Sequence, residues 1–257
     1  MNVGVQMFTL RRFTQNEADL VATLERLADI GFESIQMSAF GPIAIDDVAS
    51  HCRAANIGVT ATHTPWPRLL EDLPAVIEEH VQLDCRHTAV GMIPPAEYLS
   101  LEGLQNFLRE GEVIARALSK AGITFSYHHH HHEFRWFDGK PWLEHLCEQA
   151  PALGIGIELD THWIVAGGGD PVAWIERVGD NMPLLHLKDF SINEQNRRTF
   201  AAIGQGNLNW SNILDTASKH PIEHYFIEQD DCYGEDEFHC LQQSYDFLTQ
   251  FEASRDH

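Results

Sequence analysis

Residues 154–171 read GIGIELDTHWIVAGGGDP and join the end of a strand to the start of a helix. The first four of these residues are apolar or small, and the segment then turns polar at Glu158, Asp160 and His162, which is the pattern of a buried strand with a polar end. The run GGGDP then predicts a helix, with Asp170 as its N-cap and Pro171 at its first position. A buried strand followed by a helix is the repeating unit of a parallel α/β fold.

The same alternation of strand and helix runs through all 257 residues. Eight strands, each followed by a helix, imply parallel pairing, and at this length they favour a closed (β/α)8 TIM barrel over an open sheet. No GxGxxG follows the first strand, so a dinucleotide-binding fold lacks its main sign. We therefore predict a single TIM-barrel domain over 1–257, with strands at 2–9, 32–39, 57–64, 87–93, 123–130, 154–162, 182–190 and 224–231, and helices at 17–30, 45–55, 68–83, 101–120, 141–150, from 171 onward, 210–218 and 235–252.

The chain is strongly acidic, with a formal net charge of -21 from 38 Asp and Glu against 17 Lys and Arg. This charge repels nucleic-acid phosphates and anionic lipids, so we expect no nucleic acid and no membrane as partner. No apolar run reaches the roughly 20 residues that span a bilayer, and the chain opens on a strand rather than a signal peptide. The 5 cysteines have no CxxC spacing, so we expect a reducing, cytoplasmic setting.

The later strands end in side chains that can bind metals, on the side of the barrel where active sites form. Within one strand these residues lie two positions apart and share a face. Buried charges are costly unless they are paired or bind a metal, so the pattern indicates a site at the barrel mouth. The residues are His63 in the third strand, His128 and His130 in the fifth, Glu158, Asp160 and His162 in the sixth, His186 and Lys188 in the seventh, and Glu228 and Asp230 in the eighth.

One ligand from each of strands five to eight gives the predicted metal set His128, Asp160, His186 and Glu228. Two imidazoles and two carboxylates carry a charge that a divalent cation neutralises. Mixed nitrogen and oxygen donors suit manganese, cobalt, zinc or iron(II) better than calcium. His130 can replace His128 after a shift of two residues, and a hydrogen-bonded network without an ion is the alternative to a metal site.

Three other side chains at the mouth have open roles. Glu158 is expected either to orient a histidine ligand from behind or to pair with Lys188. Lys188 is a candidate to hold a substrate oxygen or to act as an acid, and His63 is a candidate substrate contact.

The run His128 to His132 is taken as native sequence, because a strand and Glu133-Phe134 flank it. Side chains alternate along a strand, so at most two of the five can face one site, and we expect the other three to be solvated. Tryptophans in predicted strand-to-helix loops can either form an apolar wall for a sugar ring or serve loop packing; they are Trp66, Trp136 and Trp163.

In these residues the sequence resembles the sugar phosphate isomerase/epimerase family, which has a xylose-isomerase-like TIM barrel and falls in the AP endonuclease family 2 superfamily. The resemblance covers essentially the whole chain. It rests on segments in the family's order: GVQMFTLR at 4–11, YHHHHHEF at 127–134, ELDTHW at 158–163, HLKDF at 186–190, GQGNLNW at 204–210 and IEQDDCYG at 227–234. The resemblance implies a divalent metal, often manganese, that chelates adjacent oxygens of a sugar or keto-sugar, and proton transfer through a metal-stabilised enediolate.

Three positions depart from the family pattern. Many epimerases of the family carry a proton-transferring Glu where this chain has His128, so their symmetrical two-Glu mechanism is not expected here in the same form. The usual Asn between two histidines is His129, and the usual Glu of the Gly-Glu-Gly loop is Gln205.

We therefore expect an enzyme, a metal-dependent isomerase or epimerase of a sugar or keto-sugar. Manganese is the favoured ion, and cobalt, zinc, magnesium and iron(II) are compatible. A dehydratase or lyase that uses the same site for β-elimination is the alternative. The net charge disfavours a DNA endonuclease, the full ligand set disfavours a non-catalytic sugar-binding protein, and self-association as a homo-oligomer is left open. The candidate catalytic residues are Glu228, His130 and Lys188, and the candidate substrate contacts are His63, Glu158, Trp66 and Glu133.

Overall fold

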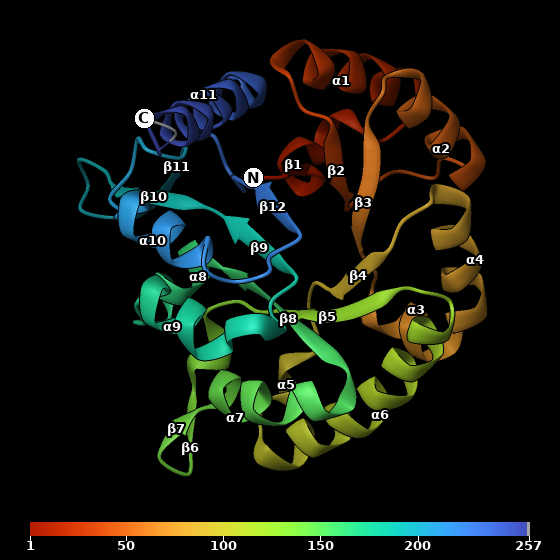
Figure 1. Ribbon diagram of the computed structural model, residues 1–257, viewed down its shortest axis with the longest axis vertical. Helices are drawn as coiled ribbons and strands as arrows, with labels where there is room; N and C mark the ends of the chain where they lie inside the picture. Colours follow the sequence, from red (N-terminus) through yellow and green to blue (C-terminus); the bar gives the residue numbers. More distant parts are fainter. Residues whose placement is uncertain (256–257) are drawn as a thin grey trace.

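Eight parallel strands close into a barrel in the computed structural model, which describes residues 1–255 (Figure 1). Around the barrel the strands follow the order β1-β12-β9-β8-β5-β4-β3-β2, so each barrel strand pairs with the barrel strand before it and the one after it in the sequence. The predicted TIM barrel is confirmed. Its strands are β1 (Val3–Gln6), β2 (Ser34–Met37), β3 (Gly58–His63), β4 (His87–Val90), β5 (Thr124–His128), β8 (Ile155–Asp160), β9 (Leu184–Leu187) and β12 (His224–Ile227).

Helices surround the barrel on its outer side, as Figure 1 shows. The first helix illustrates how the sequence sets their ends: the Asn16 side chain accepts a hydrogen bond from the Asp19 amide, and Gly31 ends the helix at a φ of 113°. The helices are α1 (Glu17–Ile30), α2 (Ile45–Ala54), α3 (Trp66–Glu71), α4 (Leu73–Leu83), α5 (Pro95–Tyr98), α6 (Leu101–Lys120), α7 (Trp142–Gln149), α8 (Thr161–Ala166), α9 (Pro171–Val178), α10 (Trp210–Ala217) and α11 (Glu237–Arg255).

Short elements fill the loops between these units. Two hairpins leave the barrel, and four 3-10 turns connect strands and helices within the described residues. The hairpins are β6 (Trp136–Phe137) with β7 (Lys140–Pro141), and β10 (Asp189–Ile192) with β11 (Arg198–Ala201). The turns are η1 (Met7–Phe13), η2 (His132–Phe134), η3 (Ala150–Leu153) and η4 (Gly179–Asn181).

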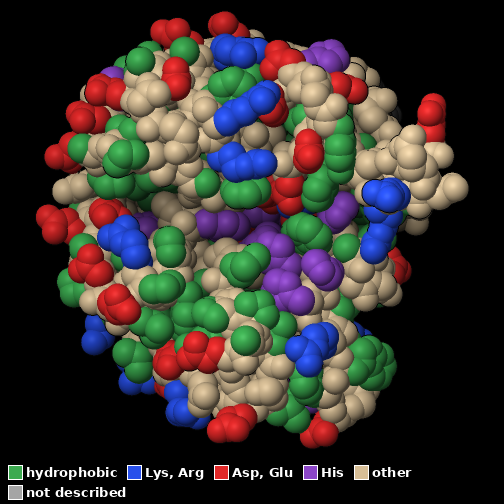
Figure 2. All heavy atoms as spheres, turned by 180° about the vertical axis from the view of Figure 1, so that it is seen from behind, with side chains coloured by type: hydrophobic (Ala, Val, Ile, Leu, Met, Phe, Trp, Pro, Cys, Tyr) green, Lys and Arg blue, Asp and Glu red, His purple; other side chains and the backbone are tan. Residues whose placement is uncertain are grey.

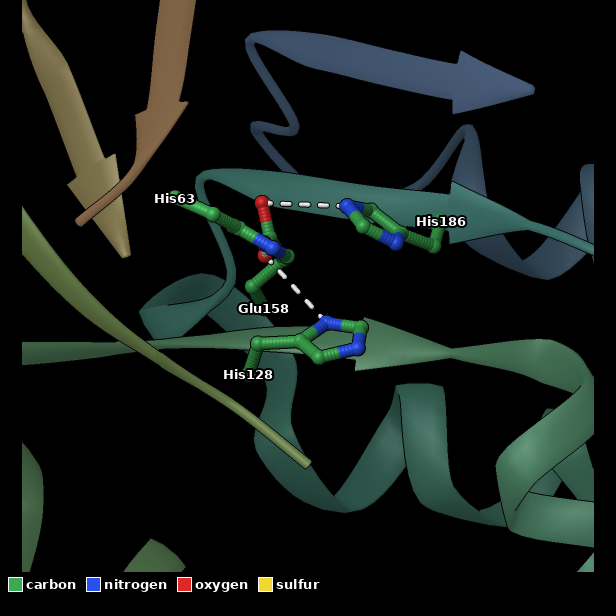
Figure 3. Close-up of side chains that lie close together, drawn as sticks. All are labelled: His63, His128, Glu158 and His186. Atoms are coloured by element: carbon green, nitrogen blue, oxygen red, sulfur yellow. Dashed lines mark hydrogen bonds and ion pairs between the residues drawn. The ribbon is translucent and has the colours of Figure 1, made fainter. Parts of the chain in front are cut away.

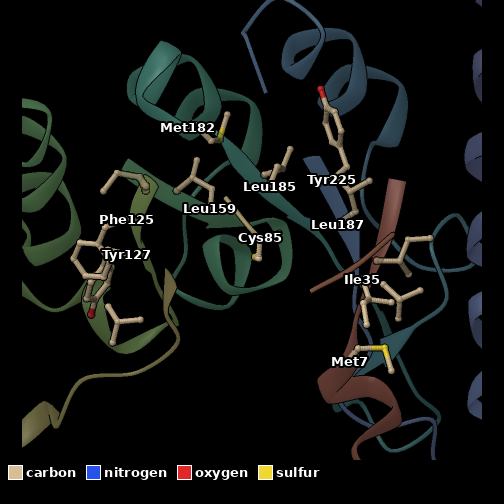
Figure 4. Close-up of a cluster of buried hydrophobic side chains, with 14 of the residues drawn as sticks. Met7, Ile35, Cys85, Phe125, Tyr127, Leu159, Met182, Leu185, Leu187 and Tyr225 are labelled. Atoms are coloured by element: carbon tan, nitrogen blue, oxygen red, sulfur yellow. The ribbon is translucent and has the colours of Figure 1, made fainter. Parts of the chain in front are cut away.

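The main core lies between the barrel and its helices. Figure 4 shows Phe125, Leu159 and Leu185 in this layer, on strands β5, β8 and β9. Helix α6 packs closely on the barrel at Gly111, where a Cβ atom would lie 2.9 Å from Ile155 Cδ1. Close packing of this kind fixes the strand positions, and so fixes where the strand ends meet.

The barrel interior changes from apolar to polar along the strands. A separate cluster of Ala61, Leu184 and Phe226 fills its lower part. Because side chains two positions apart share a face, the next inward residues of the same strands are His63, His186 and Glu228. The alternation of inward and outward side chains along each strand therefore places apolar residues at the floor of the barrel and polar residues at its mouth.

Several predicted boundaries were wrong, because strands predicted over 123–130, 182–190 and 224–231 end at His128, Leu187 and Ile227. Three further differences have a clear local cause. The strand predicted over 154–162 ends at Asp160, whose side chain accepts a hydrogen bond from the Trp163 amide and caps α8, so His162 is helical. The helix predicted over 68–83 is two helices that meet at Asp72. The first strand ends at Gln6, whose side chain accepts from the Phe8 amide and starts a 3-10 turn.

Across residues 1–255 we find no helix with the length and apolar character that a bilayer crossing requires.

Candidate active site

Glu158 on β8 is the centre of a buried cluster inside the barrel (Figure 3). Its Oε2 lies 2.6 Å from His63 Nε2 and 3.2 Å from His128 Nδ1, and its Oε1 lies 3.3 Å from His186 Nε2. Burial by itself would raise the pKa of Glu158, but His186 and His63 outweigh it and hold the pKa well below its ordinary value. One ionised carboxylate therefore faces three imidazoles.

Two glutamines complete this cluster, and neither was predicted. Gln36 Nε2 donates to Glu158 Oε1 at 2.6 Å, while Gln36 Oε1 accepts from Gln6 Nε2 at 2.8 Å. The same Gln36 Oε1 lies 2.7 Å from His186 Nε2. An amide oxygen can only accept, so His186 carries a proton on Nε2. The available signal was a polar residue at an inward position of two otherwise apolar strands.

His186 also joins a second group of donors nearer the mouth. Its Nδ1 lies 2.9 Å from Glu228 Oε2 and 3.9 Å from Asp160 Oδ2. Burial would lower the pKa of His186, but Glu158 and Glu228 outweigh burial and raise the pKa to about 10. With no metal bound, the ring is a cation held between carboxylates.

Lys188, just beyond β9, is the second buried cation of the site, with 1% of its side chain exposed. Its Nζ lies 3.4 Å from Asp160 Oδ2, 3.0 Å from Glu228 Oε2 and 2.8 Å from Asp230 Oδ1. Burial would lower the pKa of Lys188, but these carboxylates raise it above its ordinary value. The ammonium also lies 5.0 Å from the centre of the Trp163 ring, within cation–π range.

The donor groups fit a divalent cation. Asp160 Oδ1 accepts from the Trp163 amide, but its buried Oδ2 has no hydrogen-bond partner. Gln36 fixes the His186 proton on Nε2, so Nδ1 can give its lone pair to an ion once its own proton leaves. Two sets can each bring donor atoms within 4.8 Å of one another: His63, His128, Glu158 and His186, and Asp160, His186 and Glu228.

Three of the four predicted metal ligands converge, namely Asp160, His186 and Glu228. His128 lies in the other set, beside Glu158, with its ring centroid 4.5 Å from that of His186. Burial, followed by the charge of His186, lowers the pKa of His128 well below its ordinary value, so the ring is neutral. Its buried Nδ1 forms no hydrogen bond and faces Glu158 Oε2 at 3.2 Å, so the two atoms could share a cation.

The histidine run divides differently from the prediction. His128 and His130 line the cavity at the mouth. His129, which was expected to be solvated, is fully buried, because its Nε2 accepts the Asp160 amide proton at 3.1 Å. His132 is partly buried, with 20% of its side chain exposed. The expectation of three solvated histidines was therefore wrong.

Some predicted residues do not line the cavity. Glu133 is fully buried and accepts hydrogen bonds from the Tyr127 hydroxyl at 2.7 Å and the His130 amide at 2.9 Å. His162 on α8 packs against Phe200. Trp136 is on a hairpin with 70% of its surface exposed, so it forms no part of an apolar wall.

A cavity of about 520 Å³ opens at the mouth of the barrel. Figure 2 shows histidine side chains gathered in a hollow on this face. The loops after β1, β3 and β4 supply an apolar wall that includes Phe8, Trp66, Ile93 and Pro94, whereas the strand ends supply His63, His128, His130, Lys188, Glu228 and Asp230. A cavity with one apolar and one polar side suits a small molecule whose polar atoms face the strand ends.

A closed barrel with imidazoles and carboxylates at its strand ends has the architecture of a TIM-barrel enzyme site. The sequence matches the family described as Xylose isomerase-like TIM barrel over residues 24–237, and the chain belongs to that family. The resemblance noted from the sequence is thereby confirmed.

Solved structures of similar proteins cover nearly the whole chain. A sugar phosphate isomerase/epimerase from Parabacteroides distasonis ATCC 8503 is 23% identical with a TM-score of 0.81, over 96% of this chain and 92% of that chain. An L-ribulose 3-epimerase is 16% identical with a TM-score of 0.74, over 99% and 95% of the two chains. The IOLI protein with a bound zinc atom is 11% identical with a TM-score of 0.72, over 97% of each chain. No curated protein matches the sequence.

Proposed function

We propose that this protein is a divalent-metal-dependent isomerase or epimerase of a sugar or keto-sugar. The observation that carries the proposal is the convergence of Asp160, His186 and Glu228 at the base of a cavity that Glu228 and Lys188 line. Membership of the xylose-isomerase-like family and the likeness to an L-ribulose 3-epimerase support this reaction class.

Asp160, His186 and Glu228 would hold the ion, with His128 and Glu158 beside them. Manganese is our proposed ion, and cobalt, zinc, magnesium and iron(II) suit the same donors. The zinc atom of the IOLI protein supports a divalent ion in this kind of barrel. When bound, a divalent cation polarises a substrate carbonyl and makes the neighbouring proton easier to remove.

The side chains around the cavity are assigned separate roles in substrate binding and proton transfer. Lys188 is charged, so it donates to a substrate oxygen and does not act as a base. Glu228 is ionised and lines the cavity, and we assign the proton transfer to it. Burial lowers the pKa of His130 to about 2, so this ring is neutral and can accept a hydrogen bond from a substrate hydroxyl. Trp66 offers an apolar surface to a sugar ring.

A dehydratase or lyase is the second candidate, favoured by the acids at the mouth. Asp230 Oδ1 lies 2.8 Å from Lys188 Nζ, and both residues line the cavity. Burial, followed by the charge of Glu228, raises the pKa of Asp230 to about 7. A proton is therefore available for an oxygen that leaves during β-elimination.

Metal content tests the site. We expect about one Mn²⁺ per chain at the mouth in purified, untagged protein after metal loading, and its loss in the variant Asp160→Asn with Glu228→Gln. The matched control is Glu25→Gln with Asp29→Asn, which makes the same charge change on the exposed side of α1 and should keep the ion. Wild-type protein that binds no divalent ion would overturn the proposal.

Product analysis tests the reaction. Metal-loaded protein is incubated in deuterated water with D-fructose, D-tagatose and L-ribulose, and followed by NMR. An isomerase or epimerase incorporates deuterium beside the carbonyl and forms a second sugar. A lyase instead forms an unsaturated product that absorbs in the ultraviolet, which would replace the first candidate by the second.

A further inference from the structure

The turn after β5 gathers a second group of metal-binding side chains outside the cluster around Glu158. The 3-10 turn η2 (His132–Phe134) brings His132 and Glu133 back toward His130. The rings of His130 and His132 are nearly parallel, at an interplanar angle of 9° and a centroid distance of 5.4 Å. One donor atom from each of the three residues can lie within 4.8 Å of the other two.

Glu133 is a buried carboxylate without a Lys or Arg counter-charge. None of its side chain is exposed, and among residues 1–255 its sole ion-pair contact is His132 Nε2, 3.1 Å from Oε1. The Tyr127 hydroxyl and the His130 amide donate to it, but both donors are neutral. A buried anion needs a compensating cation nearby.

The two histidines leave lone pairs for that cation. His130 Nδ1 is buried and forms no hydrogen bond, and the buried His132 Nε2 forms none either, although it lies 3.1 Å from Glu133 Oε1. His129 cannot supply the charge, because its Nε2 accepts from the Asp160 amide and its Nδ1 donates to the His130 carbonyl. The cluster therefore combines one anion with two imidazole nitrogens, one of which, His132 Nε2, already faces the carboxylate and could share a cation with it.

We infer that His130, His132 and Glu133 form a second divalent-cation site at the rim of the barrel. Two imidazoles and one carboxylate are a donor set that zinc prefers, and three protein ligands leave a position for water or another oxygen ligand. This site shares no residue with the group formed by Asp160, His186 and Glu228. Because His130 also lines the cavity, an ion here would fix its ring at the cavity wall.

Zinc stoichiometry of the untagged full chain tests this inference. Each protein is stripped with a chelator, equilibrated with Zn²⁺ at one buffered free concentration, and analysed for zinc per chain. We expect two ions in the wild type and one in His132→Asn. The matched control His131→Asn removes an exposed neighbour in the same run that lies outside the cluster, so it should retain two.

The double variant Asp160→Asn with Glu228→Gln separates this site from the one at the mouth. It should bind one zinc ion per chain, and adding His132→Asn to it should remove that ion. If the site at the mouth fails but this inference holds, the wild type binds a single ion that His132→Asn loses. The inference is overturned if His132→Asn binds as much zinc as the wild type. It is also overturned if His131→Asn loses as much zinc as His132→Asn, which would mean diffuse chelation by the exposed run.

Discussion

Glu158 and His186 lie on neighbouring strands with both side chains fully buried, and Glu158 Oε1 is 3.3 Å from His186 Nε2. Gln36 contacts both of them, as a donor to Glu158 and as an acceptor from His186. The His186 ring, whose Nδ1 we propose as a metal ligand, is thus held on its Nε2 side by an amide and a carboxylate. Outer contacts of this kind set the affinity of a ligand histidine for its ion.

Glu158→Gln should weaken metal binding while leaving the proposed ligands Asp160, His186 and Glu228 in place. The substitution keeps the shape of the side chain but removes the charge that faces three imidazoles. We expect the affinity for Mn²⁺ to fall by roughly 10–100-fold in a calorimetric titration of stripped protein. The control is Glu79→Gln on α4, which removes a carboxylate that pairs with Arg68 of α3. Equal affinities in all three proteins would contradict a role for Glu158.

Lys188→Met should destabilise the metal-free protein strongly, because it leaves the carboxylates of Asp160, Glu228 and Asp230 without their shared cation. Breaking a buried pair costs about 3–5 kcal/mol in the free energy of unfolding. A divalent ion should recover more stability in this variant than in the wild type, because it replaces the missing positive charge. The measurement is urea unfolding with and without Mn²⁺.

Lys140→Met is the matched control for this experiment, since Lys140 pairs with Glu148 at the surface. Surface pairs contribute about 0–1 kcal/mol. If both variants lose the same stability and respond equally to Mn²⁺, Lys188 does not neutralise the site in the manner we describe.

Much of the fold could be predicted from local pattern. Strand and helix alternate clearly, and the two-residue alternation predicted that His186 would lie at the polar mouth; the structure adds an apolar floor at Leu184, two residues earlier on the same strand. The strand end at Asp160 was missed because its side chain acts as a helix cap, and cap geometry depends on the backbone rather than on hydrophobic period.

The site was only partly predictable because its contacts cross the barrel. Glu158 and Asp160 are two positions apart, so the sequence alone predicted that they share one face of their strand. Which of the two carboxylates contacts His63 and His128 depends on how neighbouring strands are shifted along each other in the barrel. Gln36 was missed because a single inward glutamine is a weak signal within one strand. Its role appears only when β2 closes against the rest of the barrel.

His80 should make the stability of the fold depend on pH. It is buried on α4, with Nδ1 2.7 Å from the Val76 carbonyl and Nε2 2.9 Å from Thr62 Oγ1. Burial lowers its pKa below the ordinary value of 6.5. At pH values below 6.5 the unfolded chain therefore binds a proton at His80 more readily than the folded chain does. The contribution of His80 to the free energy of unfolding is complete above pH 6.5 and is lost as the pH falls toward the lower pKa of the folded state.

His80→Gln removes the titratable imidazole and should make the free energy of unfolding less dependent on pH. The free energy of unfolding in urea is compared at about pH 7.5 and about pH 5.5 for both proteins. The difference between the two pH values should be smaller in the variant. The exposed His239 on α11 serves as the control position, and His239→Gln should behave as the wild type does. Identical curves for His80→Gln and the wild type would exclude His80 as the source.

Phe107→Ala should destabilise the barrel without changing the metal site. Phe107 on α6 is fully buried, with its ring centroid 5.1 Å from those of both Trp66 and Tyr127. Loss of a buried Phe side chain costs about 3–5 kcal/mol because it removes apolar contacts and leaves a cavity. The control Val113→Ala changes a residue on the same helix that is 67% exposed, and surface changes stay within about 0.5 kcal/mol.

Both α6 variants should bind Mn²⁺ with wild-type affinity, because the aromatic partners of Phe107 are Trp66, Tyr127 and Trp142, and none of these is a proposed ligand. Urea unfolding and calorimetric titration on the same samples separate the two effects. A variant that kept its stability would show that α6 can repack around the missing ring. If Phe107→Ala stayed folded but lost the ion, the aromatic layer around Trp66 would be what positions the strand ends. Packing outside the barrel and the geometry of the ligands inside it would then be coupled.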